Sequence, residues 1–128
     1  MITNCILWGD SASTDNEISN SSGSDTPVVS YSDIEGGYNG TGNINIDPNF
    51  VNANNGDFHL TSGSSCIDAG DLNGTYAGQV DIDGEDRVNN SRVDIGVDEY
   101  VAPSGQYVIT ISSAGGGSVT TPAEGQFS

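Results

Sequence analysis

The sequence contains no lysine, and its only cationic side chains are Arg87 and Arg92, against 18 acidic residues in a chain of 128. The formal net charge is therefore −16 at pH 7. Binding to nucleic acid or to an anionic membrane surface requires clustered Lys and Arg, so this charge balance argues against both partners. The same balance favours cations, above all Ca²⁺, whose protein ligands are oxygens.

Long apolar runs are also missing. No segment approaches the roughly 18 apolar residues of a membrane-spanning helix, so no membrane insertion is expected. The first ten residues, MITNCILWGD, lack a basic start and have a single short apolar patch, so they do not form a signal peptide. They are typical of the middle of a strand, and the last residues, PAEGQFS, contain no closing signal. We therefore expect this chain to be part of a longer protein.

Helical periodicity is nearly absent, because Gly, Asn, Asp and Ser interrupt every candidate helix. Hydrophobic residues make up only 34% of the chain, and 18 residues are glycine, which favours many short strands with thin cores. Such strands suit a sandwich, a barrel or a solenoid. The long polar excursion from Asp10 to Asp25 favours a solenoid, in which insertions loop out without breaking the stack. The strands are expected around residues 3–8, 27–34, 44–46, 50–51, 58–60, 80–82, 93–97 and 107–111.

The two cysteines, Cys5 and Cys66, lie far apart and belong to no metal-binding or redox motif. They could form one disulfide. We favour two small buried side chains, because free cysteine is among the residue types most often buried.

Several short motifs, taken in order, resemble the C-terminal end of bacterial right-handed parallel β-helix proteins of the choice-of-anchor Q type, which are secreted or surface-anchored. The resemblance covers nearly all of residues 1–100, although Ser65 stands where a proline is usual. The motifs are NCILWG (4–9), VSYSDIEGG (29–37), GNI (42–44), DPNFV (47–51), GDFHL (56–60), SCIDAG (65–70), DIDG (81–84) with Arg87, and DIGVDEY (94–100). The tail from Tyr107 to Pro122, with Glu124 and Gly125, resembles the opening of an internalin-type B-repeat.

This resemblance implies an all-β fold made of the terminal coils of a right-handed parallel β-helix, an irregular capping segment and the start of a second small β module. The corresponding boundaries are 1–60 for the coils, 61–100 for the Asp-rich cap, 101–105 for a linker and 106–128 for the incomplete repeat. In such a solenoid, apolar side chains stack in ladders, and Asn and Ser at the corners bond the backbone groups that the sheets leave free. The open end exposes strand edges, and we expect residues 61–100 to cap them.

The best candidate site is Asp81, Asp83 and Asp86, because alternating carboxylates followed by Gly84 resemble the start of a calcium loop. Asp68, Asp71, Asp94, Asp98 and Glu99 could fold back on this trio. The distant bidentate Glu of an EF-hand is missing, and Arg87 competes for the same carboxylates. The alternative, which we favour slightly, is a structural turn in which Asp caps backbone amides and Arg87 pairs with one carboxylate.

Evidence for catalysis within this chain is weak. Paired carboxylates are typical of glycosidases, but with 18 acids some pair will always qualify by chance. A polysaccharide lyase also needs a base and a neutralising cation, which this chain scarcely offers. His59 is expected to point outward as an ordinary surface residue, between the inward Phe58 and Leu60.

The resemblance therefore implies a non-catalytic structural or adhesin-like segment of an extracellular or cell-surface bacterial protein, which ends the solenoid and connects it to anchoring modules. A polysaccharide or cell-surface glycan is the expected partner. One alternative is the tail of a carbohydrate-active β-helix enzyme, a polysaccharide lyase or glycoside hydrolase, whose catalytic residues lie upstream. Another is a calcium-stabilised surface module around residues 81–86.

Overall fold

The computed structural model describes residues 1–11, 17–19 and 26–103. The predicted B-repeat start and residues 104–105 of the predicted linker lie outside the described residues. Within them the chain forms short strands and turns, and its only helix is one turn of 3₁₀-helix, as the missing helical periodicity predicts. No helix of this described part is both long and apolar enough to cross a membrane. The elements are β1 (Ile2–Thr3), β2 (Ile6–Leu7), β3 (Val29–Ser30), β4 (Asp33–Ile34), β5 (Phe50–Asn52), η1 (Ala53–Asn55) and β6 (Asp57–Leu60).

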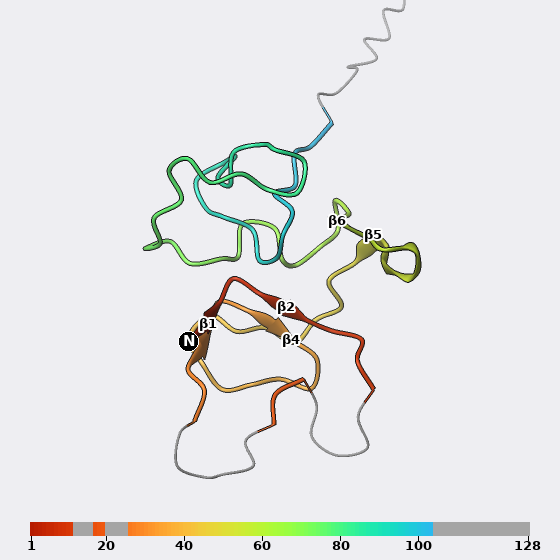
Figure 1. The fold of residues 1–128 in the computed structure, drawn as a ribbon, viewed down its shortest axis with the longest axis vertical. Helices are drawn as coiled ribbons and strands as arrows, with labels where there is room; N and C mark the ends of the chain where they lie inside the picture. Colours follow the sequence, from red (N-terminus) through yellow and green to blue (C-terminus); the bar gives the residue numbers. More distant parts are fainter. Residues whose placement is uncertain (12–16, 20–25, 104–128) are drawn as a thin grey trace, which may run out of the picture.

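The first four strands form two parallel pairs, β1 with β3 and β2 with β4. Ile6 is in register with Asp33, and a parallel bridge from Asp33 to Ile44 adds a third layer. Segments separated in sequence therefore stack in the same direction, as the solenoid interpretation requires. Figure 1 shows these strands together in one half of the molecule. The described strands do not, however, close a complete coil.

A left-handed backbone turn recurs at the same level of each layer. Asn4 separates β1 from β2 with φ 53°, Tyr31 separates β3 from β4 with φ 48°, and Gly42 precedes Ile44 with φ 70°. The amide of Asn4 donates to the carbonyl of Tyr31 at 3.1 Å, and the amide of Tyr31 donates to the carbonyl of Thr41 at 2.8 Å. A Cβ at position 42 would lie 2.4 Å from Cδ1 of Tyr31, so glycine is required there by both backbone conformation and space.

Polar side chains satisfy the backbone at the position after each turn, as expected for solenoid corners. Oγ of Ser32 accepts the amide of Cys5 at 3.2 Å. Oδ1 of Asn43 in turn accepts the amide of Ser32 at 3.1 Å, while its Nδ2 donates to the carbonyl of Val29. These bonds join the three layers where the turns interrupt the strand ladder.

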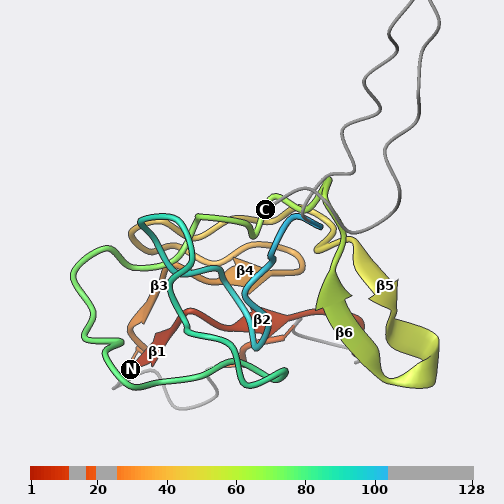
Figure 2. The same cartoon turned by 90° about the horizontal axis from the view of Figure 1, so that it is seen from above.

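Strands β5 and β6 form an antiparallel hairpin closed by η1 and by Gly56 in the left-handed conformation. The rings of Phe50 and Phe58 meet edge to face, with centroids 5.3 Å apart. Leu60 is buried as predicted, whereas Phe58 is 44% exposed and the inward prediction for it was wrong. The hairpin extends sideways from the stacked strands (Figure 2).

Residues 61–103 form a layer of loops that packs against the stacked strands (Figure 1). The core between them is small and centres on Leu60, Cys66 and Ile95, against which Ile6 and Ile44 pack. Asn4 holds the layer in place. Its carbonyl accepts the amide of Gly96 at 3.1 Å, and its Oδ1 accepts the amide of Asp71 at 2.8 Å.

The strands predicted at 80–82 and 93–97 are not formed, apart from an isolated bridge between Val80 and Asp86. Val93 and Ile95 are fully buried nonetheless. The amide of Asp94 donates to the carboxylate of Glu99, and that of Ile95 donates to the carbonyl of Cys66. Because successive amides bond to different segments, no ladder develops, and apolar alternation alone misidentified this segment.

Both thiols are free. Cys66 is completely buried, as expected, and Sγ lies 3.3 Å from Oδ2 of Asp33. Cys5 is only partly buried, and its Sγ donates to the carbonyl of Thr3 at 3.1 Å.

Candidate functional site

Buried carboxylates hold the loop layer together by accepting backbone amides. Oδ1 of Asp81 accepts the amides of Asp83 and Glu85, each at 2.9 Å, and Oδ2 accepts that of Glu99 at 3.1 Å. Oδ2 of Asp98 accepts the amide of Leu60 at 2.7 Å and so joins β6 to the layer. The two bonds within residues 81–85 agree with the interpretation of this loop as a structural turn in which Asp81 caps backbone amides.

Asp94 and Glu99 form the centre of this network, and both are almost completely buried. The two oxygens of Asp94 accept the amides of Asp68 at 2.6 Å and Tyr100 at 2.7 Å. Those of Glu99 accept the amides of Asn89 at 3.0 Å and Asp94 at 2.9 Å. Burial raises the pKa of both carboxyls, and the amide bonds oppose that increase.

The two arginines bond to the backbone. Nη2 of Arg87 donates to the carbonyls of Asp94 at 3.2 Å and Gly96 at 3.0 Å, and Nη1 is buried without a partner. The prediction that Arg87 pairs with a carboxylate was wrong: among the described residues its hydrogen bonds go from Nη2 to backbone carbonyls, and it forms no ion pair. Arg92 donates to the carbonyls of Gly70 and Ala69, and its guanidinium lies over the ring of Tyr31, 5.7 Å from the centroid.

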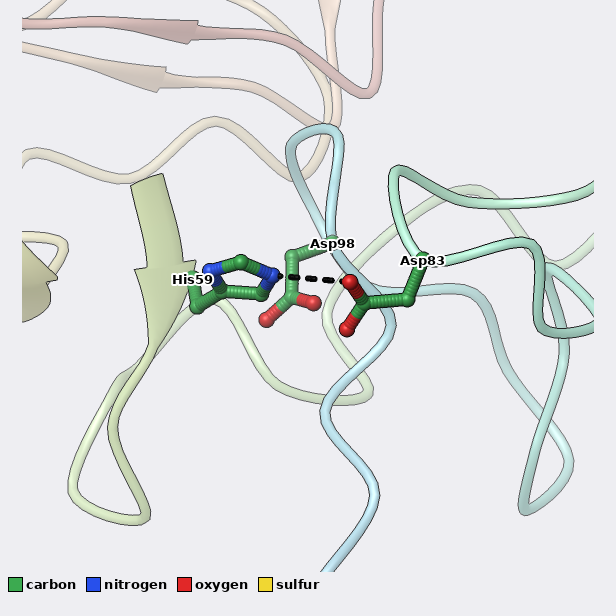
Figure 3. Close-up of side chains that lie close together, drawn as sticks. All are labelled: His59, Asp83 and Asp98. Atoms are coloured by element: carbon green, nitrogen blue, oxygen red, sulfur yellow. Dashed lines mark hydrogen bonds and ion pairs between the residues drawn. The ribbon is translucent and has the colours of Figure 1, made fainter. Parts of the chain in front are cut away.

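A histidine and three carboxylates meet where the hairpin faces the loop layer. Nδ1 of His59 lies 2.6 Å from Oδ1 of Asp57, and Nε2 lies 3.2 Å from Oδ1 of Asp83. His59, Asp83 and Asp98 each offer one ligand atom, and these atoms lie within 4.8 Å of one another. Figure 3 shows the three side chains converging from β6, from the loop at residue 83 and from the segment at residue 98. They line an open hollow of about 570 Å³ together with Glu85.

The carboxylates change the acid–base properties of this histidine. Hydrogen bonds to Asp57, and then to Asp83, raise the pKa of His59 to about 9. The same bond to His59 lowers the pKa of Asp57. Both ring nitrogens of His59 thus face carboxylates, and the imidazole is not placed to activate a hydroxyl or a thiol. Burial raises the pKa of the Cys66 thiol to about 12, which opposes formation of a nucleophilic thiolate.

The trio predicted from the sequence occupies three different environments. Partial burial raises the pKa of Asp81, but the amides of Glu85, Glu99 and Asp83 outweigh it and hold the pKa below its usual value. Asp83 is exposed and turns toward His59, and Asp86 is exposed beside its bridge to Val80. In the part of the chain that the structure describes, the convergent group includes Asp83 alone of these three. Calcium binding at the trio remains a prediction.

Of the five acids considered able to fold back on the trio, Asp98 lies beside Asp83, and Glu99 reaches Asp81 through its amide. The carboxylates of Asp68, Asp71 and Asp94 bond elsewhere.

The interpretation of His59 as an ordinary surface residue does not agree with the structure. The available signal was the spacing of Asp57 and His59, since residues i and i+2 of a strand lie on the same side. The partners Asp83 and Asp98 could not be deduced from spacing, because irregular loops bring them to the hairpin.

The arrangement is therefore better suited to holding backbone and cations than to acid–base or nucleophilic catalysis. Comparisons of the chain with protein-family models, with curated proteins and with solved structures found no match.

Proposed function

We propose that this chain is a non-catalytic structural, adhesin-like segment of a secreted or cell-surface β-helix protein. Residues 1–60 would form the terminal coils, and residues 61–100 would end the solenoid and connect it to anchoring modules. The observation that carries the proposal is the register of the three left-handed turns at Asn4, Tyr31 and Gly42. A solenoid repeats the same bend at the same place in each coil and pairs its strands in parallel. In this chain, parallel pairs lie on both sides of the bend, β1 with β3 and β2 with β4.

The loop layer supports the terminating role. Its irregular loops pack against Ile6 and Ile44. A further coil of the solenoid would otherwise cover these two side chains. The amides of the loop layer bond to carboxylates and to carbonyls of scattered segments rather than to one neighbouring strand, so it offers no regular edge for another coil. The acidic, lysine-free composition is consistent with an extracellular position.

A glycan is the partner class that we propose. Trp8, Phe50 and Phe58 line a hollow of about 290 Å³ together with Ile6 and Val97. Hollows lined by aromatic side chains with few polar groups are typical binding sites for small ligands. The net charge of −16 favours a neutral or cationic saccharide over an acidic one.

The location is tested by immunolabelling. Antibodies raised against the full chain should label intact cells of the native organism, and mild protease treatment of those cells should remove the signal. Labelling confined to lysed cells would contradict a surface or secreted role.

The absence of catalysis is tested by an activity assay. The same full chain should release neither reducing ends nor unsaturated uronates from a panel of neutral and acidic polysaccharides.

The coil arrangement is tested by solution NMR. Cross-strand contacts are expected between Ile6 and Asp33 and between Asp33 and Ile44. Their absence in a folded sample would refute the stacked coils.

Glycan binding is tested through the fluorescence of Trp8, the single tryptophan, during titration with neutral oligosaccharides. A Phe58→Ala variant should weaken the response, and an unchanged response would place the glycan elsewhere.

A further inference from the structure

We infer that His59, Asp83 and Asp98 form a site for one divalent transition-metal ion of the zinc class, which joins the β5–β6 hairpin to the loop layer. The three ligand atoms come from three separate segments and lie within 4.8 Å of one another. Nε2 of His59 and Oδ1 of Asp83 are already 3.2 Å apart. Ligand atoms about 2.0–2.1 Å from a tetrahedral zinc ion are separated from one another by roughly 3.3 Å. The three ligand atoms therefore need only small side-chain movements to coordinate one ion.

Asp98 is held in position as the third ligand. Its side chain is buried, with 5% of the residue exposed. Oδ2 accepts the amide of Leu60 at 2.7 Å, which fixes the carboxylate beside the end of β6 and within reach of His59 and Asp83. Figure 3 shows this carboxylate beside the imidazole of His59 and the carboxylate of Asp83.

The surroundings of His59 match those of a metal ligand. In metalloproteins, the ring nitrogen that does not bind metal usually donates to a carboxylate, which fixes the orientation of the ring. Asp57 fills this role, with Oδ1 2.6 Å from Nδ1 of His59. Nε2 is thereby directed toward Asp83 and Asp98. The open hollow of about 570 Å³ in front of the three side chains leaves room for water as a fourth ligand.

The ligand set distinguishes between metals. Calcium takes six to eight oxygen ligands, whereas imidazole combined with carboxylate suits zinc and its neighbours in the transition series. This site is therefore different from the calcium trio considered in the sequence, with which it shares only Asp83. It also does not depend on the proposed surface function, because it rests on contacts within this chain.

The test uses the untagged full chain, stripped with chelator and then equilibrated with Zn²⁺ or Co²⁺. We expect one metal per chain after gel filtration and an intense visible absorption of the Co²⁺ form, which indicates tetrahedral coordination. His59→Gln and Asp83→Asn should abolish the Co²⁺ absorption, and Asp57→Asn should weaken affinity about 10- to 100-fold. Asp83 is exposed, so its variant should remain folded.

Asp86→Asn is the matched control, since it removes an exposed acid of the same loop that lies outside the site. It should bind Zn²⁺ with unchanged affinity. The inference is overturned if the folded wild-type chain binds no Zn²⁺, or if binding survives in both His59→Gln and Asp83→Asn. It is also overturned if Asp86→Asn loses as much affinity as those variants.

Discussion

The amide of Leu60 donates a 2.7 Å hydrogen bond to Oδ2 of Asp98, a buried carboxylate 38 positions further along the chain. This bond connects the last residue of β6 to the loop layer, next to the core residue Ile95. Further hydrogen bonds from amides to buried carboxylates recur within residues 61–103, where bonds to scattered backbone carbonyls take the place of a strand ladder.

Removal of the Asp98 carboxylate should therefore destabilise the fold. Asp98→Ala leaves the buried amide of Leu60 without an acceptor, and we expect a loss of about 1.5–3 kcal/mol in the free energy of unfolding. Urea denaturation in the presence of chelator measures this loss without any contribution from metal. Asp86→Ala, at an exposed position of the same segment, should stay within about 0.5 kcal/mol of wild type. Equal effects of the two substitutions would contradict the structural role of Asp98.

Gly42→Ala should weaken the stacked strands. Position 42 has φ 70°, and a new Cβ would meet the ring of Tyr31. We expect a loss of about 1–3 kcal/mol, measured by urea denaturation followed by circular dichroism. Gly63→Ala is the control, because its Cβ would meet no atom within 4 Å and its φ is not in the left-handed range. A Gly42→Ala protein as stable as Gly63→Ala would mean that the turn is not formed in solution.

The pair formed by Asp57 and His59 predicts a pH dependence of stability in chelator. The pKa of His59 is raised from 6.5 to about 9 in the folded chain, so the folded state holds the proton more tightly than the unfolded state. The resulting stabilisation is complete below pH 6.5 and disappears as the pH rises through 9. Urea denaturation at low salt across this interval should show the decline, and His59→Gln should abolish that part of it. An identical slope in His59→Gln would assign the decline to other groups.

The two thiols should differ in reactivity. Cys66 is fully buried, and burial raises its pKa to about 12, whereas Cys5 is partly exposed. Labelling of the native chain with Ellman's reagent should modify Cys5 first and Cys66 on the order of 100-fold more slowly, because Cys66 reacts only after the core opens. Cys5→Ser should remove the fast phase, and urea should make both thiols reactive. Fast labelling of Cys5→Ser would contradict the burial of Cys66.

The features that sequence predicted best depend on local chemistry. The short strands around Ile6, Val29 and Phe50, the burial of Cys66 and the use of Asp as amide acceptors follow from residue type and near neighbours. The strand predicted at 93–97 failed because its apolar residues are buried by loops and not by a ladder. Alternation reports burial, and burial does not require a strand.

Two other features depend on contacts that sequence does not reveal. Tyr31 adopts a left-handed turn that is uncommon for an aromatic residue, and it does so between Asn4 and Gly42 in the layers on either side. His59 gains its partners from residues 83 and 98, which no spacing rule connects to β6. In both cases the determining neighbour is distant in sequence, so the local pattern favoured the commoner interpretation.

The carboxylates of the loop layer recognise peptide N–H groups and not side chains. Each position that donates an amide to them can therefore change its side chain without losing the bond, provided that it does not become proline, which has no N–H to donate. Sequence drift at these positions would leave the shape of the layer intact, whereas drift at the acceptors would not. Four acidic residues, Asp81, Asp94, Asp98 and Glu99, therefore constrain this half of the molecule, whereas a donor such as Asn89, whose amide alone is bonded to them, is free to diversify.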